Sequence, residues 1–214
     1  MTMRKALGAA VLAGSLAAAM PASATLTFNS GVGGNQGTDN LIFNACGLAS
    51  NSGLTVQGCL NSNHDTLVNI TGSESLHING GQAVIDASNG TPFTSFTIAM
   101  DDPSLGFSRL IFNVDAVADG FATVTATDQF GQVFNFTNIE LDGNGQNFFN
   151  LGSLDGQVAV SLTFTTNVGI SNISDLTQVR LGPTALTPVP EPATLALFGA
   201  GLLGLGFVRA RRGS

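Results

Sequence analysis

The side chains that could do chemistry in this chain are a few acids, two histidines and two cysteines. His64 and Asp65 place an imidazole beside a carboxylate, and Asp101 and Asp102 form a carboxylate pair. Nucleophilic catalysis needs a serine and a histidine that meet in space, and glycoside hydrolysis needs two carboxyls across a cleft. His64 lies in a polar stretch, Pro103 after the acid pair indicates a turn, and the chain has no G-x-S-x-G elbow. The sequence therefore predicts a protein that is not an enzyme.

Calcium is the one cation that the acids suggest. The stretch Asp142-Gly143-Asn144-Gly145-Gln146-Asn147 begins like an oxygen-rich calcium loop. It departs from the EF-hand pattern, because the sixth position is Asn147 instead of glycine and the twelfth is Ser153 instead of glutamate. A turn is the alternative interpretation. Loop carboxylates elsewhere could also supply oxygen ligands, namely Asp39, Asp65, Asp101 and Asp102. We expect no other cofactor.

Cys46 and Cys59 are the only cysteines and are separated by twelve residues. In an oxidising compartment we expect them to form a disulfide, which closes the Gly/Asn/Ser-rich segment 47–58. A ring of this size stabilises a fold by about 3 kcal/mol through loop entropy. A metal pair or a free nucleophile is the alternative, but there is no C-x-x-C spacing, and His64 and His77 are not spaced as ligands.

The elements that must position these groups have the pattern of strands. Apolar and polar residues alternate over 122–127, 133–139 and 158–165, which indicates half-buried strands. Further strand candidates are 67–71, 83–86, 93–100, 109–114 and 178–181. The pairs Asp119-Gly120, Asp142-Gly143 and Asp155-Gly156 are hairpin-type signals, and Phe130-Gly131 marks a fourth turn. About eight to ten short strands predict an all-β fold with an antiparallel β-sandwich or jelly-roll core.

The N-terminus has the composition of an export signal. Arg4 and Lys5 precede an apolar run over 6–19, and Ala22 and Ala24 provide a small-x-small cleavage site. We expect cleavage after Ala24 during passage through the Sec export machinery. An uncleaved N-terminal membrane anchor is the alternative.

The C-terminus combines a proline motif, an uncharged segment and a basic cluster. Val189, Pro190, Glu191 and Pro192 precede sixteen uncharged residues, 193–208, which are followed by Arg209, Arg211 and Arg212. As a helix the uncharged segment spans about 24 Å, less than the roughly 30 Å core of a bilayer. An ordinary C-terminal membrane anchor is the alternative interpretation. The run Gly199-Ala200-Gly201-Leu202-Leu203-Gly204 matches the dinucleotide pattern, but no strand precedes it, so we exclude nucleotide binding.

This tail resembles the PEP-CTERM sorting signal of Gram-negative bacteria. The resemblance covers about an eighth of the chain. It implies a transmembrane helix held transiently in the inner membrane, and an exosortase that reads the tail and removes it near the Pro-Glu-Pro motif. It also implies a protein at the cell surface or outside the cell, in a family that accompanies exopolysaccharide and biofilm systems. Tails of the same type end some ice-binding proteins.

We therefore divide the chain into a signal peptide (1–24), an extracellular β-sandwich (25–187) and the sorting signal (188–214). Residues 184–192 are expected to be a linker. The middle segment holds only Arg109 and Arg180 against thirteen acids. It has no cationic patch to displace phosphate counterions, so it cannot bind nucleic acid by charge.

Three functions fit these observations. The first is a non-enzymatic surface or extracellular-matrix protein associated with exopolysaccharide or biofilm. The second is a carbohydrate-binding sandwich, for which the absence of Trp and Tyr means that a site must use Phe, Asn and Asp. The third is an ice-binding surface on the threonines at 123, 125 and 127 and at 163 and 165, although solvent-facing threonine is common in sheets.

Overall fold

The computed structural model describes residues 25–31, 37–43, 46, 52–79, 84–154, 156–174 and 179–186. These residues form twelve strands and no helix, which confirms the all-β prediction. The strands are β1 (Thr25–Ser30), β2 (Asp39–Ile42), β3 (Ser52–Leu60), β4 (Asn63–Asn79), β5 (Val84–Ala87), β6 (Phe93–Met100), β7 (Leu105–Ala116), β8 (Gly120–Asp128), β9 (Val133–Leu141), β10 (Asn147–Leu154), β11 (Ala159–Ser174) and β12 (Arg180–Ala185).

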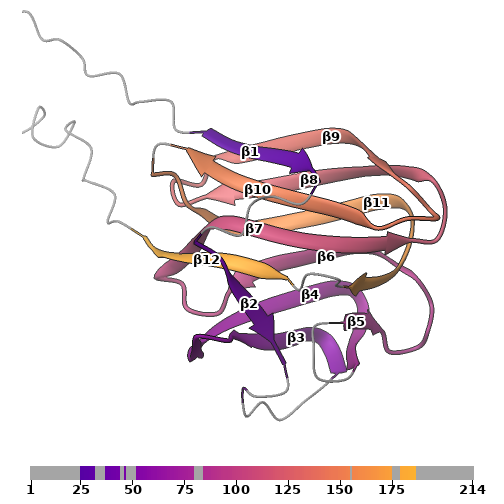
Figure 1. Cartoon of the computed structure of the whole chain (residues 1–214), viewed down its shortest axis with the longest axis horizontal. Coiled ribbons are helices and arrows are strands. Elements are labelled where there is room, and N and C mark those ends of the chain that lie inside the picture. Colours follow the sequence, from indigo (N-terminus) through magenta and orange to yellow (C-terminus); the bar gives the residue numbers. More distant parts are fainter. Residues whose placement is uncertain are drawn as a thin grey trace, which may run out of the picture.

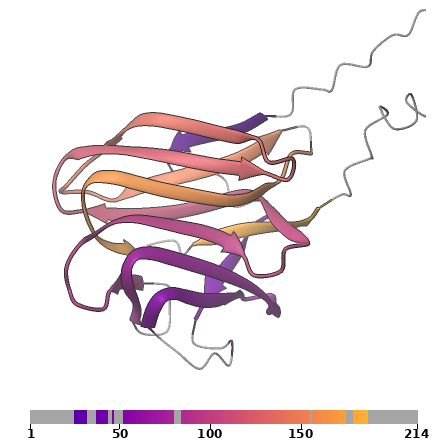
Figure 2. The ribbon, with the colours of Figure 1, turned by 180° about the vertical axis from the view of Figure 1, so that it is seen from behind.

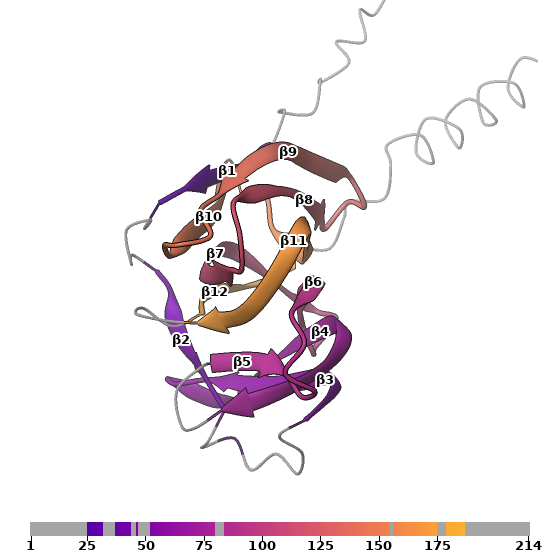
Figure 3. The ribbon, with the colours of Figure 1, turned by 90° about the vertical axis from the view of Figure 1, so that its right-hand side faces the viewer.

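The strands form two facing layers, as a sandwich requires. One layer contains β1, β10, β7, β12 and β2 in that order (Figure 1). The other layer contains β3, β4, β6, β11, β8 and β9. Figure 2 shows the molecule from behind, with this layer facing the viewer. Figure 3 shows the two layers edge-on, with β5 at one end. Pairing is antiparallel except between β7 and β11, which pair in parallel with several register shifts.

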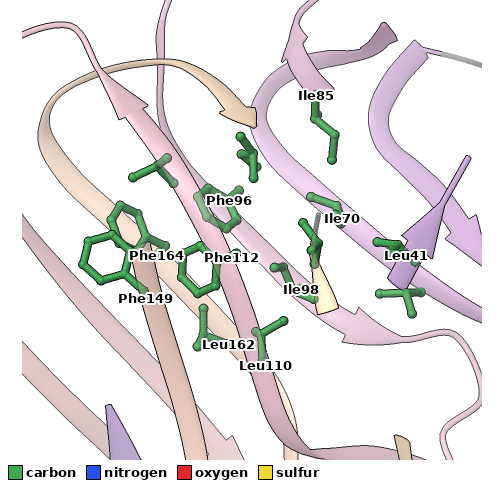
Figure 4. Packing of buried hydrophobic residues seen from close by; sticks show 14 of the residues in the cluster. Leu41, Ile70, Ile85, Phe96, Ile98, Leu110, Phe112, Phe149, Leu162 and Phe164 are labelled. Carbon is green, nitrogen blue, oxygen red and sulfur yellow. The ribbon is translucent and has the colours of Figure 1, made fainter. Parts of the chain in front are cut away.

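Phenylalanine rings fill the space between the layers. Phe112 on β7 and Phe149 on β10 come from one layer, and Phe96 on β6 and Phe164 on β11 come from the other (Figure 4). The Phe96 and Phe164 rings are stacked with centroids 5.3 Å apart, and Phe112 meets each of them edge-on at 5.7 and 5.8 Å. Offset and edge-to-face contacts of this kind add to the stabilisation from apolar burial.

Two of the three Asp-Gly pairs do not form hairpins, and Asp155 of the third lies outside the described residues. The connection at Asp119-Gly120 joins β7 to β8, and the connection at Asp142-Gly143 joins β9 to β10, yet neither pair of strands is hydrogen-bonded together. Each connection instead carries the chain from one layer to the other. The predicted turn at Phe130-Gly131 is a hairpin turn, between the paired strands β8 and β9, where Gly131 has φ of 78°. The hairpin prediction was therefore wrong for both connections.

The predicted linker over 184–192 was wrong at its start. Thr184 and Ala185 belong to β12 and pair with Gly106 and Leu105 of β7. The N–H of Leu186 then donates to the carbonyl oxygen of Ser104 at 2.9 Å. The fold consequently holds the chain as far as Leu186, because β7 offers an open neighbouring position.

The β-sandwich has two distinct ends. At one end, which we call the exit end, β1 begins opposite Leu154 and β12 ends opposite Leu105 (Figure 1). At the other end, which we call the cleft end, β8 begins at Gly120 opposite Leu141, where β9 ends. β11 runs from the exit end to the cleft end, because Ala159 pairs with Asp128 at the exit end and Thr166 pairs with Ala122 at the cleft end.

Candidate functional site

Two hollows of the described surface lie at the cleft end, around the exposed ring of Phe121. This residue is 51 % exposed, and its backbone N–H donates to Asn167 Oδ1 at 2.8 Å. In β8 the residues Ala122 and Val124 are buried. Successive side chains of a strand point to opposite faces, so Phe121 faces away from the core. An exposed phenylalanine at a fixed position is a suitable stacking surface for a ligand ring.

Two polar hollows share Phe121 as a common wall. The first, of about 450 Å³, is lined by Phe121, Ala122, Thr123, Asn138, Thr165, Thr166 and Asn167. The second, of about 530 Å³, is lined by Asp119, Gly120, Phe121, Glu140, Leu141, Asp142, Asn144 and Asn147. The ring is thus flanked by hydroxyl and amide groups on one side and by carboxylates and amides on the other. Convergent polar groups around an apolar surface are typical of binding sites.

A bulge in β9 borders the first hollow. The register between β8 and β9 shifts between Ala122, which pairs with Ile139, and Val124, which pairs with Phe136. β9 therefore has an extra residue there, and Asn138 adopts a left-handed backbone with φ of 58°. Asparagine tolerates this conformation better than most residues. Bulges redirect side chains and are frequent beside functional sites.

Hydroxyl groups continue from the first hollow across the outer face of this layer. Thr123 on β8 pairs with Thr165 on β11, and the Thr165 hydroxyl lies 3.1 Å from that of Ser95 on β6. At the next outward-facing position of these strands, a row of paired side chains crosses the layer from β3 to β9: Thr55, Thr71, Thr97, Thr163, Thr125 and Asn135. The residues of this row therefore recur at the strand spacing of about 4.8 Å. The hydroxyls of Thr55 and Thr71, and those of Thr97 and Thr163, are hydrogen-bonded at 2.8 Å. The two threonine ladders seen in the sequence lie in register on adjacent strands.

The Asp142 loop is closed by its own hydrogen bonds. Asn147 accepts a hydrogen bond from the Asp142 N–H at 2.8 Å and donates to the carbonyl oxygens of Asp142 and Val114 at 2.9 and 3.2 Å. Asp142 Oδ1 accepts from the Asn144 N–H at 2.8 Å. Gly143 is required here, because a Cβ would collide with the backbone of Ala118. The loop therefore has the geometry of a turn, which was the alternative to a calcium loop.

The predicted oxygen ligands Asp102 and Asp101 also accept hydrogen bonds from the protein itself. Asp102 Oδ1 accepts from the N–H and the hydroxyl of Ser104 at 2.8 and 2.7 Å, and these bonds hold the pKa of Asp102 below its ordinary value. Asp101 Oδ1 accepts from Asn69 Nδ2 at 2.9 Å. Across the residues that the structure describes, no three His, Cys, Asp or Glu side chains form a group that could hold a metal ion.

Asp39 connects β2 to the turn between β3 and β4. Its two carboxylate oxygens accept from the N–H groups of Asn40 and Ser62 at 2.8 and 2.7 Å. Burial acts to raise the pKa of Asp39, but hydrogen bonds from Ser62 and Asn40, together with the charge of Arg180, outweigh it and lower the pKa.

His64 and Asp65 are exposed and lie at the beginning of strand β4. The Asp65 N–H donates to Asn63 Oδ1 at 3.1 Å, which is an ordinary turn contact. Thus the structure leaves the neighbouring imidazole and carboxylate on an open surface.

The predicted disulfide is confirmed. Cys46 and Cys59 are bonded, with Cα atoms 5.6 Å apart. Cys59 is fully buried in β3, next to Leu67 of β4 in the strand register. Ser52 to Gly58 belong to β3, so part of the segment that the disulfide closes is a strand.

The predicted targeting residues lie outside the described residues. These are the cleavage-site residues Ala22 and Ala24, the motif Val189, Pro190, Glu191 and Pro192, and the basic residues Arg209, Arg211 and Arg212. Among the residues described, no helix is long and apolar enough to cross a membrane.

Comparison with protein families identifies the tail. Residues 188–212 match the family model described as the PEP-CTERM protein-sorting motif. The tail is a PEP-CTERM sorting signal. It marks an exported protein of Gram-negative bacteria that is sorted by an exosortase to the cell surface or the extracellular space. Comparisons with curated proteins and with solved structures gave no match.

The sequence did not single out Phe121, Asn138 or Asn167. The alternation that predicted the strand over 122–127 contained a signal for Phe121, because position 121 continues the phase of Thr123 and Thr125. Asn138 and Asn167 could not be found in this way, since the bulge and the contact between β8 and β11 depend on pairing between distant segments.

Proposed function

We propose that this PEP-CTERM protein is a non-enzymatic surface or matrix protein whose β-sandwich binds neutral extracellular polysaccharide at Phe121. The observation that carries the proposal is the exposed Phe121 ring between two polar hollows. Sugar rings present C–H groups on their faces and hydroxyls on their edges. A flat apolar ring flanked by hydroxyl, amide and carboxylate groups complements both parts of such a ligand.

The hydroxyl groups on β8, β11 and β6 support a ligand longer than one sugar. Thr123, Thr165 and Ser95 extend from the first hollow across three adjacent strands. An extended glycan chain lying across the strands can exchange hydrogen bonds with each hydroxyl in turn. Contacts of this kind are individually weak, because each replaces a hydrogen bond to water. We therefore expect modest affinity for a single sugar and higher affinity for a polymer.

Charge favours a neutral polymer. The segment 25–187 has thirteen acidic residues and two basic ones, and Asp119, Glu140 and Asp142 line the second hollow. This field repels anionic polymers at low ionic strength. The association with exopolysaccharide or biofilm that the sorting signal suggests is therefore proposed for uncharged polysaccharide.

Affinity electrophoresis of the exported, tail-processed protein tests this function. Gels that contain a neutral polysaccharide should retard the wild-type protein, whereas gels with an anionic polysaccharide should not. Replacing Phe121 with alanine should weaken binding about tenfold, which corresponds to about 1.4 kcal/mol. Because hydrogen bonds within the chain hold the Asp142 turn, we expect EDTA to leave the retardation unchanged.

Phe130→Ala is the matched control, because Phe130 is 52 % exposed but lies in the turn at the exit end. It should be retarded like the wild type. If Phe121→Ala is retarded as strongly as the wild type, Phe121 is not the binding surface. If no neutral polysaccharide retards the wild type, the proposed function is wrong.

A further inference from the structure

Three large apolar side chains are exposed at the exit end of the β-sandwich. Phe130 is 52 % exposed, Val133 is 57 % exposed and Leu154 is 53 % exposed. Phe130 and Val133 lie in and just after the β8–β9 turn, and Leu154 ends β10. We call these three residues the apolar rim.

Hydrogen bonds join the two segments that carry the apolar rim. The Gln129 N–H donates to the carbonyl oxygen of Val158 at 3.0 Å, and Gln129 Oε1 accepts from the Val158 N–H at 2.7 Å. The Gln157 N–H donates to the carbonyl oxygen of Leu154 at 3.2 Å. The rim is therefore held on connected turns.

The chain leaves the fold toward the sorting signal close to this rim. A methyl group placed on Gly106 would lie 2.6 Å from Val158 Cγ1 and 3.2 Å from Leu186 Cδ2, so both side chains border Gly106. Leu186 is therefore next to Val158. Val158 is hydrogen-bonded to Gln129, which directly precedes Phe130 in the chain. The first strand also starts here, because Thr25 pairs with Leu154.

The tether between the fold and the uncharged tail segment is short. Six residues, 187–192, separate Leu186 from Ala193, where the sixteen uncharged residues begin. Fully extended, they reach about 20 Å. While the tail is in the bilayer, the exit end must stay within about that distance of the membrane. Such a short tether gives a high effective concentration, so a small apolar surface is sufficient for contact.

From these observations we propose that the exit end rests on the lipid bilayer through the apolar rim until the tail is removed. Exposed aromatic and aliphatic side chains at one end of a domain are suited to the interface between headgroups and acyl chains. Asp101 and Asp102 begin the β6–β7 turn at the same end. Because their carboxylates are charged, we expect this turn to stay in water, outside the bilayer. The cleft end, with Phe121, then points away from the membrane. This orientation depends on the sorting signal and not on polysaccharide binding.

Fluorescence quenching in the full chain tests this contact. The two native cysteines form a disulfide and the described residues include no free cysteine, so Phe130→Cys gives one labelling site for an environment-sensitive dye. The full chain is reconstituted in phosphatidylcholine nanodiscs that contain spin-labelled lipid. Val117→Cys is the matched control, because Val117 is 51 % exposed and is the first residue of the β7–β8 connection at the cleft end. The dye at position 130 should be quenched several-fold more strongly than the dye at position 117.

Hydrogen exchange provides a second measurement without a dye. In nanodiscs that hold one copy of the unmodified chain, amides 129–133 should exchange more slowly than in the tail-processed protein. The triple variant Phe130→Ser, Val133→Thr, Leu154→Ser should lose this protection and keep the exchange pattern of the core strands. Equal quenching at positions 130 and 117, or equal exchange with and without the tail, would overturn the proposal.

Discussion

The carboxylate of Asp128 is 1 % exposed and organises the turn between β8 and β9. Its Oδ1 accepts from the N–H groups of Phe130 and Gln132 at 2.9 and 2.7 Å. Its Oδ2 accepts from Gln157 Nε2 at 2.5 Å, which connects the turn to the start of β11. Gln157 Oε1 is buried and has no hydrogen-bond partner within the described chain. The Asp128 side chain thus replaces water as the acceptor for the backbone N–H groups of Phe130 and Gln132.

Two substitutions at Asp128 separate hydrogen bonding from charge. Asp128→Ala leaves both backbone donors unsatisfied and should lower the free energy of unfolding by roughly 3 kcal/mol. Asp128→Asn keeps Oδ1 for both donors, and rotating the Gln157 amide would present Oε1 to the new NH₂ group. Its cost should be below about 1 kcal/mol. Urea denaturation measures both values, and equal losses for the two variants would show that the negative charge itself is required.

Local residue patterns predicted the disulfide and eight of the twelve strands, but they did not predict β1, β2, β3 and β10 or the connections between strands. β8 and β11 were evident because alternation is a property of neighbouring residues. The Asp119-Gly120 pair indicates a turn equally well whether the next strand lies in the same layer or the opposite one. Thr184 and Ala185 resembled a linker because their strand position is fixed by β7, far away in sequence.

At the level of elements, Asp39 makes the attachment of β2 sensitive to pH. Its pKa is lowered in the folded protein, below the ordinary value of 3.8. The carboxylate therefore contributes stability that is present above about pH 4 and is lost as the pH falls through the folded pKa. Because Asp39 is only partly buried and solvent screens its charge, this contribution should be below about 1 kcal/mol.

The variant Asp39→Asn tests this contribution. At neutral pH it should be less stable than the wild type, and the difference should shrink as the pH falls below 3.8. Urea denaturation at neutral pH and near pH 3 measures the two differences. A difference that stays constant with pH would assign the effect to packing and not to ionisation.

The whole molecule is arranged along one axis. The chain leaves at the exit end near Phe130, and the polar hollows lie at the opposite end around Phe121. The sorting signal was predictable because it is a continuous stretch of residues. The opposite placement of Phe121 and Phe130 was not, because it follows from the path of β7, β8 and β11 between the ends.

Retention on the extracellular matrix of the producing cells tests the account most directly. The fraction of tail-processed protein that stays with the neutral polysaccharide is measured for the wild type, Phe121→Ala and Phe130→Ala. All three should be exported and processed equally, since neither residue belongs to the sorting signal. Phe121→Ala should be released into the medium while Phe130→Ala is retained like the wild type. Equal retention of Phe121→Ala and the wild type would contradict the account.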